Sequence, residues 1–153
     1  MENENLDRQQ IIDSYRAEVD KLLRYIPWFA SKNGSKVAKV YEDEALGEHS
    51  MKFPVYDSTL LSFVREIQTT KLIDRNYQYI YSRYRMKTVQ DELNFIDKAT
   101  ITEMKAICGI LSKYVMGGMV KGSVWMVAVE EGIFLNALLK MKDLLEFWDG
   151  PLA

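Results

Sequence analysis

Only one cysteine and one histidine occur among the 153 residues of the sequence. A single cysteine cannot form an internal disulfide, and a single histidine argues against the clustered ligands of zinc or di-iron centres. We therefore expect no metal, no cofactor and a reducing, cytoplasmic location. Cys108 itself stands in an apolar periodic run, which is typical of a buried and unreactive thiol.

Long hydrophobic runs and a strong net charge are also missing. The longest apolar runs, such as VWMVAV, are too short to span a bilayer, and the first ten residues, MENENLDRQQ, are polar and acidic, unlike a signal peptide. The formal net charge of -2 creates no global field that would attract DNA or an anionic membrane. We expect no membrane partner, and any basic site must be local.

Most of the chain instead carries apolar residues at helical spacing. One such stripe runs from Ile12 to Phe29, and Pro27 should kink or break its helix near Tyr25. A second helix is predicted over residues 58–68, a third after residue 100, and two more on either side of Gly132. We predict one all-α domain over residues 1–153, a bundle of about five to six helices. Residues 1–10 are expected as a flexible segment, and residues 36–56 as a small β-hairpin or an irregular excursion.

Two short motifs define the third helix. Thr100 and Glu103 have the spacing of a capping box, which predicts a helix start. The string MGGMVKGS contains glycines and a lysine, but it lacks a preceding strand and the GK[ST] order of a phosphate loop. We interpret it as the end of the helix at Gly117-Gly118 followed by a tight interhelical turn.

Residues 75–87, RNYQYIYSRYRMK, are rich in tyrosine and arginine. A period of two would place Tyr77, Tyr79 and Tyr81 on one face of a strand, whereas a helical period also accounts for Ile80 and Tyr84 and is favoured. From Lys71 to Lys87 five basic residues oppose one aspartate, a local charge of +4. A solvated helix face explains this charge. The alternative is an anion or nucleic-acid contact made by Arg75, Arg83, Arg85, Lys87 and Tyr79.

A second polar cluster, EDEALGEHS, brings together acidic residues and the histidine. Glu44, Glu48 and His49 could bind a cation or form an acid–base pair, but an exposed acidic loop explains them as well. We assign no catalytic residue.

Three segments of the chain resemble a bacterial domain of unknown function family (number 6508). The segments are LLRYIPWF at residues 22–29, FPVYDSTLLSFV at 53–64 and KGSVWMVAVEEGIFLNALLKMKDL at 121–144. The resemblance implies a fold but no established activity. Members tend to carry a charged Arg-Gly-Glu-Arg-Phe-like turn where this chain has Met116-Gly117-Gly118-Met119-Val120, so a functional site built on those charges would be missing here.

The sequence leaves three classes of function open. The first is a non-enzymatic interaction or regulatory domain that binds another protein or associates with itself, because core signals are abundant and catalytic signals are few. The second is nucleic-acid binding through residues 71–87. The third is an enzyme that uses the acidic loop and His49.

Overall fold

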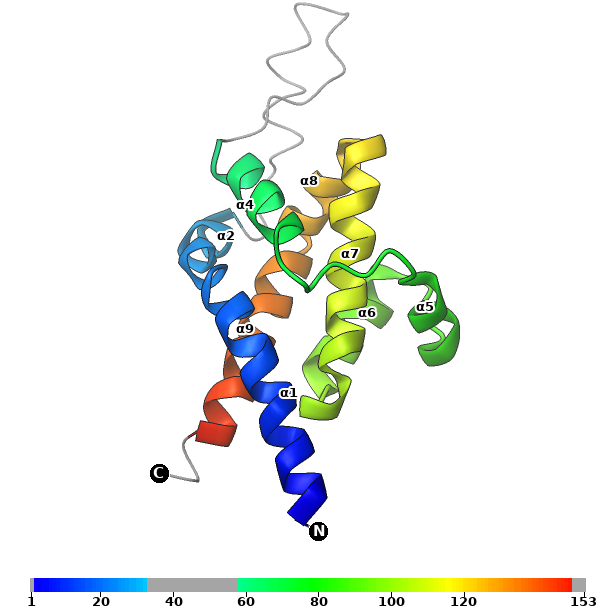
Figure 1. The fold of residues 1–153 in the computed structure, drawn as a ribbon. Helices are drawn as coiled ribbons and strands as arrows, with labels where there is room; N and C mark the ends of the chain where they lie inside the picture. The colour runs from blue at the N-terminus through cyan, green and yellow to red at the C-terminus, as the bar shows by residue number, and fades with distance from the viewer. Residues whose placement is uncertain (1, 33–57, 150–153) are drawn as a thin grey trace, which may run out of the picture.

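The computed structural model describes residues 2–32 and 58–149, which fold into a helical bundle (Figure 1). These residues form eight α-helices and contain no strand, so the all-α prediction is confirmed. The helices are α1 (Glu2–Asp20), α2 (Ile26–Lys32), α4 (Ser58–Gln68), α5 (Gln78–Tyr84), α6 (Val89–Lys98), α7 (Met104–Val120), α8 (Ser123–Glu130) and α9 (Ile133–Asp149). The hairpin or excursion expected at 36–56 lies outside the described residues. None of the helices in the described ranges has both the length and the apolar character needed to cross a membrane.

The N-terminal stripe divides into two helices, as its proline predicts. After α1 ends at Asp20, a 3₁₀ turn at Leu23–Tyr25 leads into α2, where Pro27 is the second residue. At the start of a helix a proline loses no intrahelical hydrogen bond, which makes this position compatible with its ring. Residues 2–10, expected as a flexible segment, belong to α1. Their glutamate, glutamine and arginine content favours a helix even without an apolar face.

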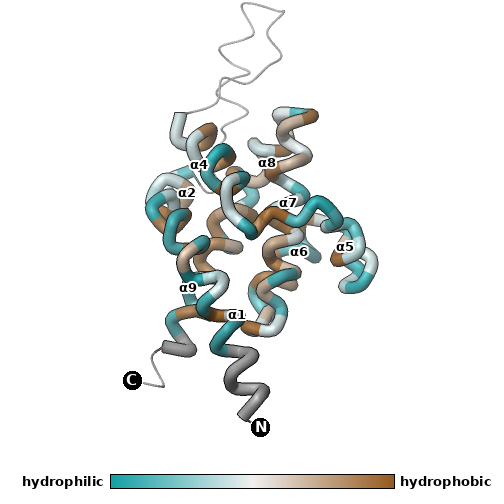
Figure 2. Tube along the Cα trace, viewed as in Figure 1, coloured by the Kyte–Doolittle hydropathy of each residue, from teal (hydrophilic) through white to brown (hydrophobic). Residues whose placement is uncertain are grey.

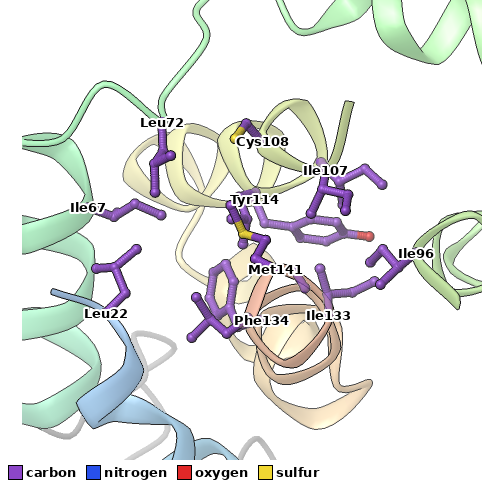
Figure 3. Packing of buried hydrophobic residues seen from close by; sticks show 14 of the residues in the cluster. Leu22, Ile67, Leu72, Ile96, Ile107, Cys108, Tyr114, Ile133, Phe134 and Met141 are labelled. Atoms are coloured by element: carbon purple, nitrogen blue, oxygen red, sulfur yellow. The ribbon is translucent and has the colours of Figure 1, made fainter. Parts of the chain in front are cut away.

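Helix α9 is the centre of the bundle, because α1, α2, α6, α7 and α8 all pack against it. Three phenylalanines fill the space between α2, α4 and α9, with ring centroids 4.8 Å apart for Phe29–Phe63 and 5.0 Å for Phe63–Phe134. Figure 3 shows Phe134 beside Met141 in this core, with Leu22 facing them from the N-terminal part of the chain. The Phe29–Phe63 pair is edge-to-face and the Phe63–Phe134 pair is tilted, and aromatic contacts of this kind stabilise the core beyond the burial of apolar area.

Helix α7 continues through the glycines at which it was predicted to end. It runs to Val120, and the prediction of a stop at Gly117-Gly118 was wrong. A Cβ atom built on Gly118 would lie 1.9 Å from Cδ1 of Trp125, so this glycine allows the indole of α8 to lie directly on the backbone of α7. Close helix packing, rather than a turn, accounts for the residue.

The tyrosine segment, residues 75–87, forms a helix only in its middle part. Residues 78–84 make α5, which ends at Arg85 in the left-handed conformation (φ 55°), and residues 75–77 form a turn before it. The helical interpretation is confirmed for α5, and Ile80 is its buried residue. The next helix, α6, begins at a capping box made by Thr88 and Asp91.

Candidate functional site

Residues 69–77, the crossing segment, join α4 to α5 and pass across α7 (Figure 1). Figure 2 shows hydrophobic residues where this segment crosses the helix and hydrophilic residues closer to α5. The backbone N–H of Asp74 donates to Oγ of Ser112 on α7 at 2.7 Å, and that hydroxyl donates in turn to the carbonyl oxygen of Cys108 at 2.7 Å. Ser112 is completely buried, so the crossing segment is fixed to α7 by a hydrogen bond shielded from water.

The two carboxylate oxygens of Asp74 have different surroundings. Oδ1 accepts the backbone N–H of Asn76 at 2.8 Å, the geometry of an Asx turn. Oδ2 is buried and has no hydrogen-bond partner within the described part of the chain. A buried acceptor without a donor is unusual, since most buried polar atoms are hydrogen-bonded.

A cavity of about 390 Å³ adjoins Asp74 and is called here the Asp74 pocket. Its lining comes from α1, the crossing segment and α7, and consists of Tyr15, Lys71, Leu72, Ile73, Asp74, Arg75, Lys105 and Cys108. Figure 3 shows Cys108 on α7 at the edge of the apolar core, on the side of Leu72.

Cations dominate the electrostatics of the pocket. Lys71, Arg75 and Lys105 line it together with a single carboxylate, that of Asp74. Within the described residues, 2–32 and 58–149, none of these three cations forms an ion pair with a carboxylate. Nζ of Lys105 lies 5.8 Å from the ring centroid of Tyr79, a cation–π distance. Three cations and one carboxylate therefore line the cavity, which gives it an excess of positive charge.

The other two polar groups of the pocket stay protonated at neutral pH. Burial, together with the negative charge of Asp74, raises the pKa of the Cys108 thiol to about 12. Burial is also the main reason why the pKa of Tyr15 rises to about 12. Neither side chain is an activated nucleophile in this environment, because thiolate and phenolate are the reactive forms.

The structure separates the basic residues singled out in the sequence. Arg75 lines the pocket. Tyr79, 42% exposed, does not line it but contacts the lining residue Lys105. Arg83, Arg85 and Lys87 are exposed near the end of α5 and do not line the cavity. The guanidinium of Arg83 lies over the ring of Tyr84, 5.5 Å from its centroid.

The acidic cluster expected as a polar site cannot be compared with the pocket. Glu44, Glu48 and His49 are outside the described residues, so their predicted role stays a prediction. Among the residues that the structure does describe, no three His, Cys, Asp or Glu side chains gather closely enough to hold a metal ion.

Glu92 on α6 is a buried polar centre that the sequence analysis did not identify. Its side chain is 1% exposed and accepts hydrogen bonds from the hydroxyls of Tyr81 and Tyr114, the latter at 2.5 Å, and from Nζ of Lys113 at 3.1 Å. In Figure 3 the Tyr114 ring extends from α7 between Ile107 and Ile133 toward α6. Burial, and then the hydrogen bond to Glu92, raise the pKa of both tyrosines well above the ordinary value.

The position of Glu92 in the sequence contains a signal for its burial. Val89, Glu92 and Ile96 recur at helical spacing, so a glutamate occupies the apolar stripe of α6. A charge at such a position needs partners, and here Tyr81, Tyr114 and Lys113 supply them. This cluster joins α5, α6 and α7 around a carboxylate that is buried from solvent, which indicates a structural role.

Comparison with known proteins gives one result. Residues 15–146, most of the chain, match a family of unknown function (DUF6508), in agreement with the resemblance of the three segments. No curated protein and no solved structure matches the chain. The protein therefore belongs to the family of unknown function DUF6508.

Proposed function

We propose that this protein is a non-enzymatic binding domain that captures a small organic anion in the Asp74 pocket. The observation that carries the proposal is the grouping of Lys71, Arg75 and Lys105 around one cavity without a carboxylate partner for any of them in the described ranges. Like charges held close together repel one another, and an anion bound between them relieves that repulsion.

The way the cations are held supports the proposal. Lys71 and Arg75 come from the crossing segment, which Ser112 fixes to α7, and Lys105 comes from α7 itself. The backbones that position the three charges are therefore connected before any ligand arrives, which lowers the entropy lost on binding. All three side chains are exposed, so we expect affinity to fall as salt is added.

The pocket chemistry favours binding over catalysis. The pKa of the Cys108 thiol and that of the Tyr15 phenol are both about 12, so neither group is ionised at neutral pH. The described lining thus supplies charge and hydrogen bonds, while neither its thiol nor its phenol is an activated nucleophile. The proposal includes a cytoplasmic location, which a single, buried and reduced cysteine supports.

Isothermal titration with ethyl phosphate and with glutarate tests this function. We expect both anions to bind at low salt, and Arg75→Gln and Lys105→Met each to weaken binding by about tenfold, the effect of losing one charge-assisted hydrogen bond. Arg83→Gln is the matched control, because it removes a cation that lies outside the pocket. Equal weakening by Arg83→Gln would mean that only general electrostatic attraction is involved, and absence of binding would refute the function.

Nucleic-acid binding through the end of α5 is the second candidate. Arg83, Arg85 and Lys87 are exposed there, which favours contact with phosphates. The rings of the segment offer little to bases, however, because that of Tyr84 packs on Phe95 at 4.6 Å between centroids. Of the tyrosines of this segment, only Tyr79 is exposed.

Retention on heparin and binding of a single-stranded oligonucleotide separate this candidate from the first. If the α5 surface binds nucleic acid, replacing Arg83, Arg85 and Lys87 with glutamate should lower both, with a steep salt dependence. Failure of the unaltered protein to bind either at about 50 mM salt would remove the candidate. A protein partner, self-association, and an enzyme using His49 stay predictions from the sequence.

A further inference from the structure

We infer that the ligand of the Asp74 pocket is a phosphate monoester, bound as a dianion that accepts a hydrogen bond from the hydroxyl of Tyr15. This inference rests on the proposed function and names the class of anion that the pocket takes. Three features of the lining support this class: its excess of charge, the separate elements from which its donors come, and the hydroxyl of Tyr15.

The charge of the lining matches a dianion. Its three cations and single carboxylate leave an excess of two positive charges. A phosphate monoester carries close to two negative charges at neutral pH, because its second pKa is about 6. A simple carboxylate or a sulfate ester carries only one, so it would leave part of the repulsion among the cations in place.

Donors reach the cavity from three elements. Tyr15 comes from α1, Lys71 and Arg75 come from the crossing segment, and Lys105 comes from α7. A phosphate monoester has three terminal oxygens arranged around one phosphorus atom, whereas a carboxylate has two oxygens in one plane. The phosphate therefore has one acceptor oxygen for each of the three elements.

The hydroxyl of Tyr15 is available to such a ligand. It makes no hydrogen bond to any group within residues 2–32 and 58–149. Among the partly or fully buried side chains of these ranges, Oδ2 of Asp74 is the only unpaired oxygen or nitrogen that is closed to solvent, so the unpaired Tyr15 hydroxyl keeps an accessible surface. Its pKa, raised to about 12 mainly by burial, keeps the proton on the oxygen, where it serves as a donor.

A contact one helical turn away supports the position of Tyr15 beside the cations. The backbone N–H of Lys71 donates to the carboxylate of Glu18 at 3.4 Å, which joins α1 to the crossing segment. Residues three apart lie on the same side of a helix, so Tyr15 is turned toward the same segment. Glu18 itself does not line the cavity and adds no carboxylate to it.

The rest of the pocket suits a small ester. A volume of about 390 Å³ lies near the lower end of the range for small-molecule pockets. Leu72 and Ile73 contribute apolar lining against which the carbon chain of the ester can pack.

Isothermal titration with three probes of similar size tests the inference at about pH 7.5 and low salt. Ethyl phosphate and ethyl sulfate have the same shape but differ in charge, whereas ethyl sulfate and butyrate have the same charge but differ in the number of terminal oxygens. We expect the affinity to fall about tenfold from ethyl phosphate to ethyl sulfate, and to fall again to butyrate, which lacks one acceptor oxygen.

The same titrations at about pH 5 isolate the charge of the ligand. Ethyl phosphate becomes largely a monoanion there, so its advantage over ethyl sulfate should disappear. Ethyl sulfate keeps its single charge at both pH values and reports any change in the protein itself. An advantage of ethyl phosphate that persists undiminished at about pH 5 would overturn selection of the dianion.

Tyr15→Phe tests the hydroxyl. This substitution removes only an oxygen that no group in the described ranges binds, so we expect unchanged stability in urea and about tenfold weaker binding of ethyl phosphate. Tyr84→Phe is the matched control, because it makes the same change at a tyrosine that does not line the cavity. A Tyr15→Phe variant that binds ethyl phosphate as tightly as the unaltered protein would overturn the role of Tyr15.

The comparison of probes on the unaltered protein separates the possible failures and does not depend on the folding of a variant. Equal affinity for the three probes would overturn the inference and leave the anion-binding function intact. No binding of any probe would overturn both.

Discussion

Replacing Gly118 with alanine should destabilise the protein, although alanine favours a helix. Gly118 is buried within α7, where the indole of Trp125 covers it. A Cβ atom at this position would lie 1.9 Å from Cδ1 and 2.0 Å from Nε1 of that ring. Carbon atoms in contact are normally about 3.5–4.0 Å apart, so the indole would have to move by roughly 1.5–2 Å.

Two opposing contributions determine the size of the effect. Glycine to alanine within a helix stabilises by about 1 kcal/mol. Displacing Trp125 costs about 1–3 kcal/mol for overpacking, and about 1 kcal/mol more if Nε1 loses its 2.9 Å hydrogen bond to the Val115 carbonyl oxygen. A ring shift of this size breaks the hydrogen bond, so we expect Gly118→Ala to lower the free energy of unfolding by about 1–3 kcal/mol.

Gly117→Ala is the matched control, since it makes the same change one residue earlier in the same helix. Its Cβ atom would lie 3.2 Å from Cγ1 of Val124, a contact that a shift of a few tenths of an ångström relieves. The gain in helix propensity then remains, and we expect this variant to be neutral or up to about 1 kcal/mol more stable.

Urea denaturation followed by circular dichroism measures both variants. A third measurement, Gly118→Ala in a Trp125→Ala background, should show the penalty disappear, because the ring that the new methyl group displaces is gone. Equal stabilities of Gly117→Ala and Gly118→Ala would refute the view that helix packing, rather than a turn, explains the glycines.

Three further outcomes follow from the buried polar groups. Glu92→Leu should lower the free energy of unfolding, measured by urea denaturation, by about 3–5 kcal/mol, because the two tyrosine hydroxyls lose their acceptor. Glu92→Gln should lower it less, and equal losses in the two variants would contradict this account of the cluster. The pKa values of Tyr15, Tyr81 and Tyr114 in the folded protein are raised above the ordinary value of about 10. The stability that these tyrosines contribute is therefore complete below about pH 10 and is lost as the pH rises further. A free energy of unfolding that does not fall between about pH 10 and 12 would contradict the raised pKa values. Cys108 should react with Ellman's reagent at pH 8 only after unfolding in urea, because burial raises its pKa to about 12; rapid reaction of the native protein would show that the thiol is accessible.

The helices that the sequence predicts best are those with one apolar face. In α4, which was predicted over residues 58–68, the apolar residues at helical spacing are all buried: Leu60, Phe63, Val64 and Ile67. A stripe of this kind carries its own information, because one buried face and one solvated face repeat with the period of the helix. The capping pair Thr100 and Glu103 is likewise local, and the N–H of Thr100 donates to the Glu103 carboxylate at 2.9 Å.

The candidate site depends on contacts between distant segments, which spacing does not reveal. Arg75 could be singled out because it belongs to a basic run, whereas Lys105 joins it only because the crossing segment lies on α7. The hydrogen bond that fixes this arrangement connects Asp74 with Ser112, 38 residues later. Helical periodicity indicates which face of a helix is buried, but not which segment covers it.

The small residues of α7 explain why the pocket exists at all. Gly109 lies under Ile80 of α5, since a Cβ atom there would be 2.4 Å from Cδ1 of that residue, and Gly118 lies under the indole of α8. On the same helix, Cys108 and Ser112 provide a thiol and a hydroxyl where larger side chains would hold the crossing segment away. Three neighbours therefore approach α7 closely, and the helix is buried on most of its surface instead of showing a single apolar face. The same close approach brings Asp74 and the cations beside it to the cavity. The packing that made the end of α7 difficult to predict from the sequence therefore also assembles the site.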